Sequence, residues 1–293
     1  MDCERNGHRR GRSGRNELKE ELLMKRKTIG AMAGLLAVAG LAGPLMAQDG
    51  TKPLSTEVKS DTKKHDAKAL EVIDTFVEKV GGKDMIMSIE STTVTGTIDI
   101  PMAGIKGSMK MYAAKPGKMA MVMELPGFGK TETGYDGEYG WSSDPMQGPR
   151  LLTEEEVSDL AEQADPNSAA KHREIYDVIS YAGEVQFSGQ KAHKINLTRP
   201  NGRESTEFYS VESGMLIGQE AVQASPMGEI KITTNLSDYK EFGGMKMPTK
   251  MVQNIGPQQI VMTITDATIN NVDNAVFERP AAVQALVEAT EKP

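Results

Sequence analysis

The sequence predicts a mainly β (α+β) domain, in which a curved antiparallel sheet of about 9–11 strands forms an incomplete β-barrel that wraps a few helices. Three observations lead to this prediction. Beyond residue 93, apolar and polar residues alternate with a period of two in run after run. Turn signals such as Asn201-Gly202 and Gly243-Gly244 separate many of these runs. The intervals between runs are mostly too short for the crossover helices that parallel strands require.

A signal peptide is expected at residues 24–47. Lys25-Arg26-Lys27 form a basic region, an apolar run follows from Ile29 to Leu41, and Leu45-Met46-Ala47 form a small-residue cleavage site. We expect cleavage after Ala47, which predicts a periplasmic or secreted protein. The apolar run is interrupted by glycine and is shorter than the roughly 20 residues of a membrane-spanning helix, so we expect no integral membrane segment in the mature form.

Residues 1–23 are polar and basic, and they precede the expected signal peptide. We interpret them as a mis-called leader, with Met24 as the true start. The single cysteine, Cys3, lies in this leader. The mature chain is therefore expected to have no disulfide, no cysteine metal site and no lipidated cysteine.

The charge balance argues against nucleic acid as a partner. The whole chain carries 34 basic and 41 acidic residues. Without the first 47 residues the balance is 25 basic against 36 acidic, a net charge of about −11. Nucleic acid and anionic membrane surfaces attract basic proteins, so neither is an expected partner.

The mature chain is expected to begin with a flexible linker at residues 48–65, which is polar and lacks apolar periodicity. A single domain then extends over residues 66–293. Its first helix starts near Asp66, carries Leu70, Ile73, Val77 and Val80 at helical spacing, and stops at Gly81-Gly82. A short helical turn is expected over residues 83–89.

The strand candidates follow in order. Val94, Gly96, Ile98 and Ile100 share one face of the first strand. The remaining candidates are residues 105–111, 119–125, 138–142, 184–188, 192–199, 204–211, 216–224, 229–236, 249–255 and 259–266. Thr153-Glu154-Glu155-Glu156 fits a capping box that opens a helical insertion. A second helical stretch is expected over residues 168–179, and a terminal helix over residues 281–290.

No motif for catalysis, metal or nucleotide binding stands out. Gly129-Lys130-Thr131 and Gly127-Phe128-Gly129 lack the other glycines of phosphate-binding loops, so they are interpreted as a turn between strands. His65, His172 and His193 are not at metal-ligand spacing; His172 is expected on a helix surface and His193 in a satisfied hydrogen bond. No serine lies in a recognisable nucleophile motif. We therefore expect no catalysis and no cofactor.

Methionine is the informative residue type, with 19 in the chain. Several fall on one predicted sheet face, where they fit either an ordinary core or a cavity for variable apolar ligands, since thioether chains adapt their shape. Both interpretations stay open. The candidate ligand-lining residues are Ile98, Met109, Met111, Met119, Met121, Met123, Leu125, Ile195, Leu197 and Ile232.

Several short segments resemble the LolA-like superfamily of outer-membrane lipoprotein-sorting-like periplasmic proteins, in an uncharacterised branch. They include the helix that ends at Gly81-Gly82, the Tyr112 to Lys118 segment, Tyr135-Asp136-Gly137-Glu138 with Trp141, the Phe208 to Leu216 segment and Ser237-Asp238-Tyr239-Lys240. The resemblance covers residues 66 to 277. It implies a half-barrel domain closed by helices, with an apolar cavity that takes acyl chains.

The expected function is that of a soluble periplasmic or secreted protein that binds or carries a hydrophobic ligand, without catalysis. The ligand would be a lipid or the acyl chain of a lipoprotein, an acylated protein or an acylated peptide, and envelope proteins are possible partners. The alternative is a structural or assembly module of the cell envelope whose cavity is filled by its own side chains. A hydrolase is the third candidate.

Overall fold

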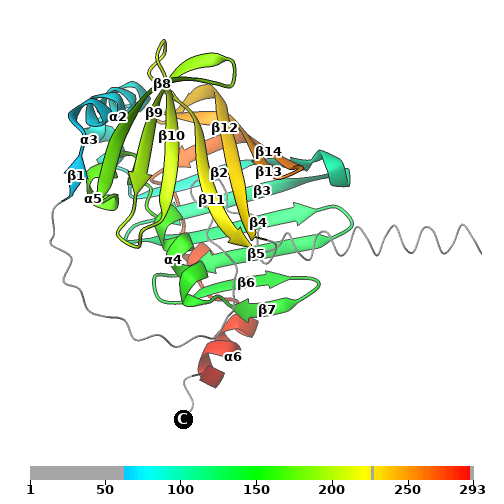
Figure 1. Cartoon of the computed structure of the whole chain (residues 1–293). Coiled ribbons are helices and arrows are strands. Elements are labelled where there is room, and N and C mark those ends of the chain that lie inside the picture. The colour runs from blue at the N-terminus through cyan, green and yellow to red at the C-terminus, as the bar shows by residue number, and fades with distance from the viewer. Residues whose placement is uncertain (1–62, 226–227, 291–293) are drawn as a thin grey trace, which may run out of the picture. The chain divides into compact units, whose positions relative to one another are not determined.

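The computed structural model describes residues 63–225 and 228–290 (Figure 1). The leader, the signal peptide with its Ala47 cleavage site and residues 48–62 of the linker lie outside the described residues. Within the described residues, no helix is long and apolar enough to cross a membrane.

One 14-stranded sheet organises the described residues, and its two edges, β1 and β7, are not paired with each other. The strand order is β1-β8-β9-β10-β11-β12-β13-β14-β2-β3-β4-β5-β6-β7. Neighbours are antiparallel except β1 and β8, which are parallel. The strands of the first half are β1 (Lys64–His65), β2 (Ser91–Ile100), β3 (Ile105–Ala114), β4 (Lys118–Leu125), β5 (Gly129–Tyr135), β6 (Gly140–Asp144) and β7 (Gly148–Leu151).

The second half of the chain forms strands that are mostly longer, and each of them pairs with the next one along the chain. They are β8 (Val178–Phe187), β9 (Gln190–Thr198), β10 (Glu204–Ser210), β11 (Leu216–Ser225), β12 (Gly228–Phe242), β13 (Met245–Ile255) and β14 (Gln258–Ile269). Figure 1 shows that the sheet curves strongly, with β9 to β12 crossing in front of β2 to β5. The predicted curved, incomplete barrel is therefore confirmed.

The helices occupy the start, the middle and the end of the described chain. They are α2 (Ala67–Val80), α3 (Lys83–Met87), η1 (Pro101–Ala103), α4 (Glu154–Gln163), η2 (Ser168–Ala170), α5 (His172–Ile175), η3 (Asn274–Phe277) and α6 (Ala281–Thr290). The Asp66 side chain accepts a hydrogen bond from Lys68 N and so caps α2. Gly81 ends α2 at a φ of 142°, a conformation that favours glycine.

The periodicities found in the sequence explain most of these elements. In α2, Ile73, Val77 and Val80 are buried against the sheet, as the helical spacing predicts. The capping box at Thr153 and Glu156 opens α4, and the terminal helix occupies the expected residues 281–290.

The sheet has more strands than the sequence indicates, because three short or polar strands carry no period-two signal. Gly129–Tyr135, which includes the Gly129-Lys130-Thr131 segment interpreted as a turn, is strand β5; the turn itself lies just before it. β7 has four residues, among them Pro149. Lys64–His65, at the end of the expected linker, pair with Val178 and Ile179 as β1.

The second helical stretch is also shorter than predicted. Helical structure is confined to η2 and α5, and Val178 and Ile179 already belong to β8. Val178 and Ile179 are β-branched, and their backbones pair with Thr198 and Leu197 of β9. Sheet pairing therefore overrides the helical pattern from Val178 onward.

Candidate functional site

Five of the candidate lining residues are methionines on one face of the adjacent strands β3 and β4. Met109 lies opposite Met123, and Met111 lies opposite Met121. Directly opposed residues in an antiparallel pair project from the same side of the sheet. Met119 follows on β4 opposite Ala113. The face continues across β2, β14 and β13, where Ile98 pairs with Met262 and Met262 with Met251.

A half-open cavity of about 440 Å³ lies on the inner side of the curved sheet. Its walls come from α2, from β3, from Arg199 just after β9, and from β10 to β13. The remaining wall comes from residues 152–177, which connect β7 to β8 and are called the inserted segment below. Most of the lining is apolar: Phe76, Val80, Met111, Ala161, Ala169, Ile175, Leu216, Leu236, Met245, Met247, Pro248 and Met251. The volume is within the range of about 300–1,000 Å³ that is typical of small-ligand sites.

The ten candidate residues are placed differently with respect to this cavity. Met111 is the one that lines it. Ile232 borders a separate recess of about 30 Å³, and Leu125 borders an open hollow of about 730 Å³ at the ends of β3 to β5. The other seven are 4% exposed or less and pack within the core: Ile98, Met109, Met119, Met121, Met123, Ile195 and Leu197. Contact of these residues with a ligand stays a prediction.

One part of the cavity wall is polar, and it centres on the buried carboxylate of Glu207. His172 Nε2 lies 3.1 Å from Glu207 Oε2, and the Tyr209 hydroxyl donates to the same oxygen at 2.5 Å. Gln219 Nε2 donates to Glu207 Oε1 at 3.1 Å. Glu207 is 5% exposed and His172 8% exposed. The prediction that His172 lies on a helix surface is therefore wrong, because α5 turns this side chain toward β10.

The electrostatics of this cluster favour a charged pair. Burial alone would raise the pKa of Glu207, but the attraction of His172 and three donated hydrogen bonds hold that pKa below its ordinary range. Burial likewise would lower the pKa of His172, but the attraction and hydrogen bond to Glu207 raise it. Burial and the charge of Glu207 raise the pKa of Tyr209 well above its usual value. Both shifts favour an ionised Glu207 beside a protonated His172.

Arg199 completes the polar part of the wall. This arginine lines the cavity, is 9% exposed and places its Cζ atom 4.9 Å from the centre of the Tyr176 ring. Tyr239, on the same wall, donates its hydroxyl to Leu216 O at 2.7 Å, and burial raises the pKa of Tyr239. The predicted hydrogen bond of His193 is present, to the Tyr181 hydroxyl at 3.1 Å, but His193 does not line the cavity.

The recess of about 30 Å³ adjoins this polar part. It shares Tyr176, Glu207 and Gln219 with the larger cavity, and Thr234 and Gln253 line it as well. A space of this size is about the volume of one water molecule in the liquid. The polar end of the cavity therefore has room for about one water molecule beside Glu207.

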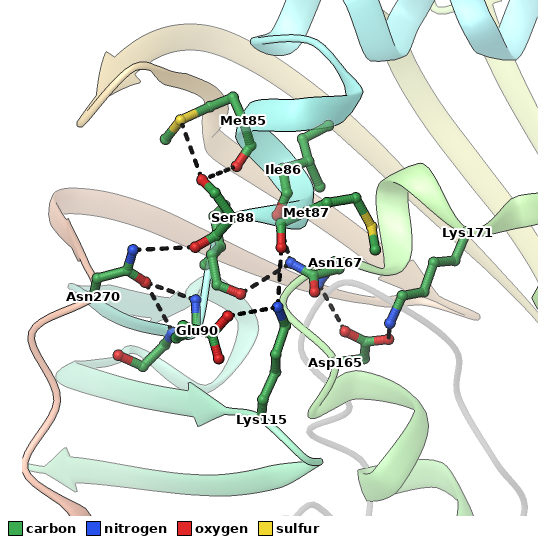
Figure 2. A network of polar contacts seen from close by, with 12 residues as sticks. Met85, Ile86, Met87, Ser88, Glu90, Lys115, Asp165, Asn167, Lys171 and Asn270 are labelled. Carbon is green, nitrogen blue, oxygen red and sulfur yellow. Dashed lines mark hydrogen bonds and ion pairs between the residues drawn. The ribbon is translucent and has the colours of Figure 1, made fainter.

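The inserted segment is held in place by side chains that bond to backbone groups elsewhere. Figure 2 shows Asn167, which directs its Nδ2 atom at Ile86 O and Ile89 O, at 2.5 and 3.1 Å. Asp165 accepts from Asn167 N and pairs with Lys171 at 2.6 Å. Arg173 adds a two-pronged ion pair with Asp74 of α2. These contacts fix the part of the wall that carries His172.

The loop that receives Asn167 is itself fixed from two other directions. Asn270 Oδ1 accepts from Glu90 N at 2.7 Å and from Ser91 N at 3.2 Å, and Asn270 Nδ2 donates to Ser88 O (Figure 2). Lys115 Nζ donates to Met87 O and pairs with Glu90. Because the end of α3 is held in this way, the carbonyls of Ile86 and Ile89 form a rigid anchor for the inserted segment.

Among the described residues, no group of three or more His, Cys, Asp or Glu side chains is arranged to hold a metal ion. The sheet and the cavity together define a half-barrel protein with a ligand-sized internal space.

Solved structures of other proteins are similar to this fold. No protein-family model and no curated protein matches the chain. The structure is similar to a DUF1329 family protein from Desulfovibrio piger ATCC 29098, with a TM-score of 0.52 and 14% identity over 74% of this chain and 99% of that one. It is also similar to the LolA superfamily protein NE2245 from Nitrosomonas europaea, with a TM-score of 0.49 and 13% identity over 72% of this chain and 97% of that one. At these identities the similarity concerns the fold alone, and the curved, incomplete barrel expected from the sequence is what the sheet shows.

Proposed function

We propose that this protein binds and carries a hydrophobic ligand, a lipid or an acyl chain, in the cavity of about 440 Å³ between the sheet and the inserted segment, without catalysis. The observation that carries the proposal is the cavity itself, which is half-open, lies against the concave sheet and is lined mainly by apolar side chains. An empty apolar space costs stability, since its lining loses packing contacts. A ligand that fills the space restores those contacts.

Methionines support the carrier role over tight recognition of one shape. Met111, Met245, Met247 and Met251 line the cavity, and the predicted methionines of β3 and β4 share the sheet face of Met111. Because the thioether side chain is flexible and polarisable, such a wall adapts to chains of different length and branching. We further propose that the protein acts in the periplasm or outside the cell after cleavage behind Ala47, where lipids and acylated proteins need a carrier through water.

The test uses delipidated protein and a fluorescent long-chain fatty acid as the probe. In Ala161→Trp, an indole is placed on α4 where Ala161 lines the cavity, so probe binding should fall at least about tenfold, equivalent to about 1.4 kcal/mol. Ala285→Trp is the matched control, because Ala285 is exposed on α6 and lies outside the lining. Its probe affinity should equal that of the wild type.

The outcomes separate the three candidate functions. Native mass spectrometry of the purified protein should find a retained lipid, and binding of the probe should be saturable. A folded sample with neither retained lipid nor probe binding would favour the structural module whose cavity is filled by its own side chains. Turnover of an ester or peptide substrate that depends on one polar residue would favour a hydrolase.

A further inference from the structure

The cavity has a polar end and an apolar end, and this division points to an amphiphilic ligand. The polar end consists of Tyr176, Arg199, Glu207 and Gln219, together with His172 and the adjoining recess. The apolar end consists mainly of residues from α2, β3, β12 and β13, and Tyr239 and Lys246 are the polar lining residues of these strands. A pure hydrocarbon would leave the buried polar groups facing an apolar surface, which costs free energy because water is displaced without replacement.

The charges that line the cavity are unequal in sign. Its acidic side chains, Asp165 and Glu207, both have partners within the protein: Asp165 pairs with Lys171, and Glu207 accepts hydrogen bonds from three side chains. Arg199 and Lys246 add positive charge to the wall.

Lys171 balances Asp165, and Arg199 and Lys246 together outweigh Glu207. The net charge around the cavity is therefore positive whether or not His172 is protonated. This local excess lies in a chain whose overall formal charge is −7. Charges of one sign in a cleft with low-dielectric walls favour a ligand of the opposite sign.

The volume of the cavity favours a ligand with a single chain. A cavity of about 150 Å³ binds benzene, with six carbons, so on that scale a cavity of about 440 Å³ accommodates roughly 18 carbons. A triacylated anchor or a diacyl phospholipid carries two or three such chains.

We propose that the ligand is a single-chain carboxylic acid of long-chain fatty acid size, with its carboxylate near Arg199 and its chain along Met111 and the methionines of β13. This inference rests on the proposed function. Arginine suits the role because its planar guanidinium matches a carboxylate with two parallel hydrogen bonds. Glu207 orients the polar end by holding His172, Tyr209 and Gln219, while its own charge is balanced by His172.

The test compares the binding of palmitic acid with that of hexadecanol, which has the same chain length and a neutral head group. Binding to the delipidated full-length mature protein is measured by calorimetry or by displacement of a fluorescent fatty acid. Wild-type protein should bind palmitate at least about tenfold more tightly, as expected for a charge-assisted hydrogen bond. Arg199→Gln should remove this preference by weakening palmitate alone. Arg203→Gln, in the same turn between β9 and β10 but outside the lining, is the matched control and should keep the preference.

Each outcome has a distinct meaning. Equal binding of palmitate and hexadecanol by the wild type overturns the inference and leaves the proposed function intact, and this comparison needs no variant to fold. Absence of binding of either ligand by folded protein overturns both. If Arg199→Gln fails to fold, Arg199→Lys, which keeps the charge, should still prefer palmitate. Displacement of palmitate by a triacylated lipopeptide at lower concentration than by free palmitate overturns the limit to one chain.

Discussion

Breaking the His172–Glu207 pair from one side should destabilise the protein more than removing both charges. In His172→Leu, the ionised Glu207 keeps the hydrogen bonds from Tyr209 and Gln219 but loses its only cationic partner among them. Both side chains of the pair are below a tenth exposed. Leaving one charge of a buried pair without its partner typically costs about 3–5 kcal/mol, so we expect a loss of stability of about that size.

The second step of the cycle replaces Glu207 with glutamine, whose amide oxygen still accepts from Tyr209. The double variant His172→Leu/Glu207→Gln contains no buried charge at this position. It should therefore be more stable than His172→Leu alone, with a coupling of about 0.5–3 kcal/mol between the two changes. The single tryptophan, Trp141, is 2% exposed, so its fluorescence in a urea titration reports global unfolding. Additive losses, with the double variant the least stable of the three, would refute the reasoning.

The pH dependence of stability supplies an independent check of the same pair. The folded pKa of His172 is raised above 6.5, so its contribution is complete below pH 6.5 and is lost as the pH rises through the raised value. The folded pKa of Glu207 is lowered below 4.5, so its contribution is complete above pH 4.5 and is lost as the pH falls through the lowered value. The stability difference between wild type and double variant should therefore be largest between pH 4.5 and 6.5. A difference that does not change with pH would contradict this assignment of charges.

Three further outcomes are expected. Gly96→Ala should lower the free energy of unfolding in urea by about 1–3 kcal/mol, because its Cβ would lie 2.3 Å from Thr263 O. The control is Thr97→Ala at the exposed neighbour, which should change stability by less than about 0.5 kcal/mol. In Asn167→Ala two backbone carbonyls lose their donor. The inserted segment should then become open to proteolysis and amide exchange at a lower denaturant concentration than the rest of the chain. Uniform protection across the chain would contradict the role of Asn167 as an anchor. Mass spectrometry of the exported protein should find Gln48 at the N-terminus, and retention of residues before it would contradict cleavage after Ala47.

The sheet could be predicted well because its signal is local. A strand with one buried face repeats apolar residues every second position, and the cross-strand pairs Met109 with Met123 and Met111 with Met121 follow once the turn between β3 and β4 is recognised. Strand β5 was not predictable in this way, since the stretch Gly129–Tyr135 is mostly polar and half-buried or exposed. It becomes a strand because β4 and β6 offer hydrogen-bonding partners on both sides.

The polar end of the cavity escaped prediction for a different reason. In β10 the consecutive residues Glu207, Phe208, Tyr209 and Ser210 are all buried, so period-two alternation gives no indication of which face carries the carboxylate. The outer face of this strand is covered by Phe187, whose ring stacks on Phe208 at 4.1 Å. His172 lies 35 positions before Glu207 in a four-residue helix. Pairs of this kind depend on tertiary packing, and no local pattern in the sequence announces them.

The two ends of the cavity come from separate parts of the chain, and this separation bears on how the site works. Most of the polar groups are supplied by the inserted segment, the turn after β9, β10 and β11. The apolar wall is supplied mainly by α2, β3, β12 and β13, which also contribute Tyr239 and Lys246. The inserted segment bridges them, and Asn167 fixes it to the carbonyls at the end of α3 without contacting the cavity. On the proposed function, head-group preference and chain-length preference are therefore expected to depend on different parts of the chain. We expect a substitution at Met247 to change the space for the chain and to leave the preference at Arg199 unchanged, so that the two properties vary independently on the same half-barrel.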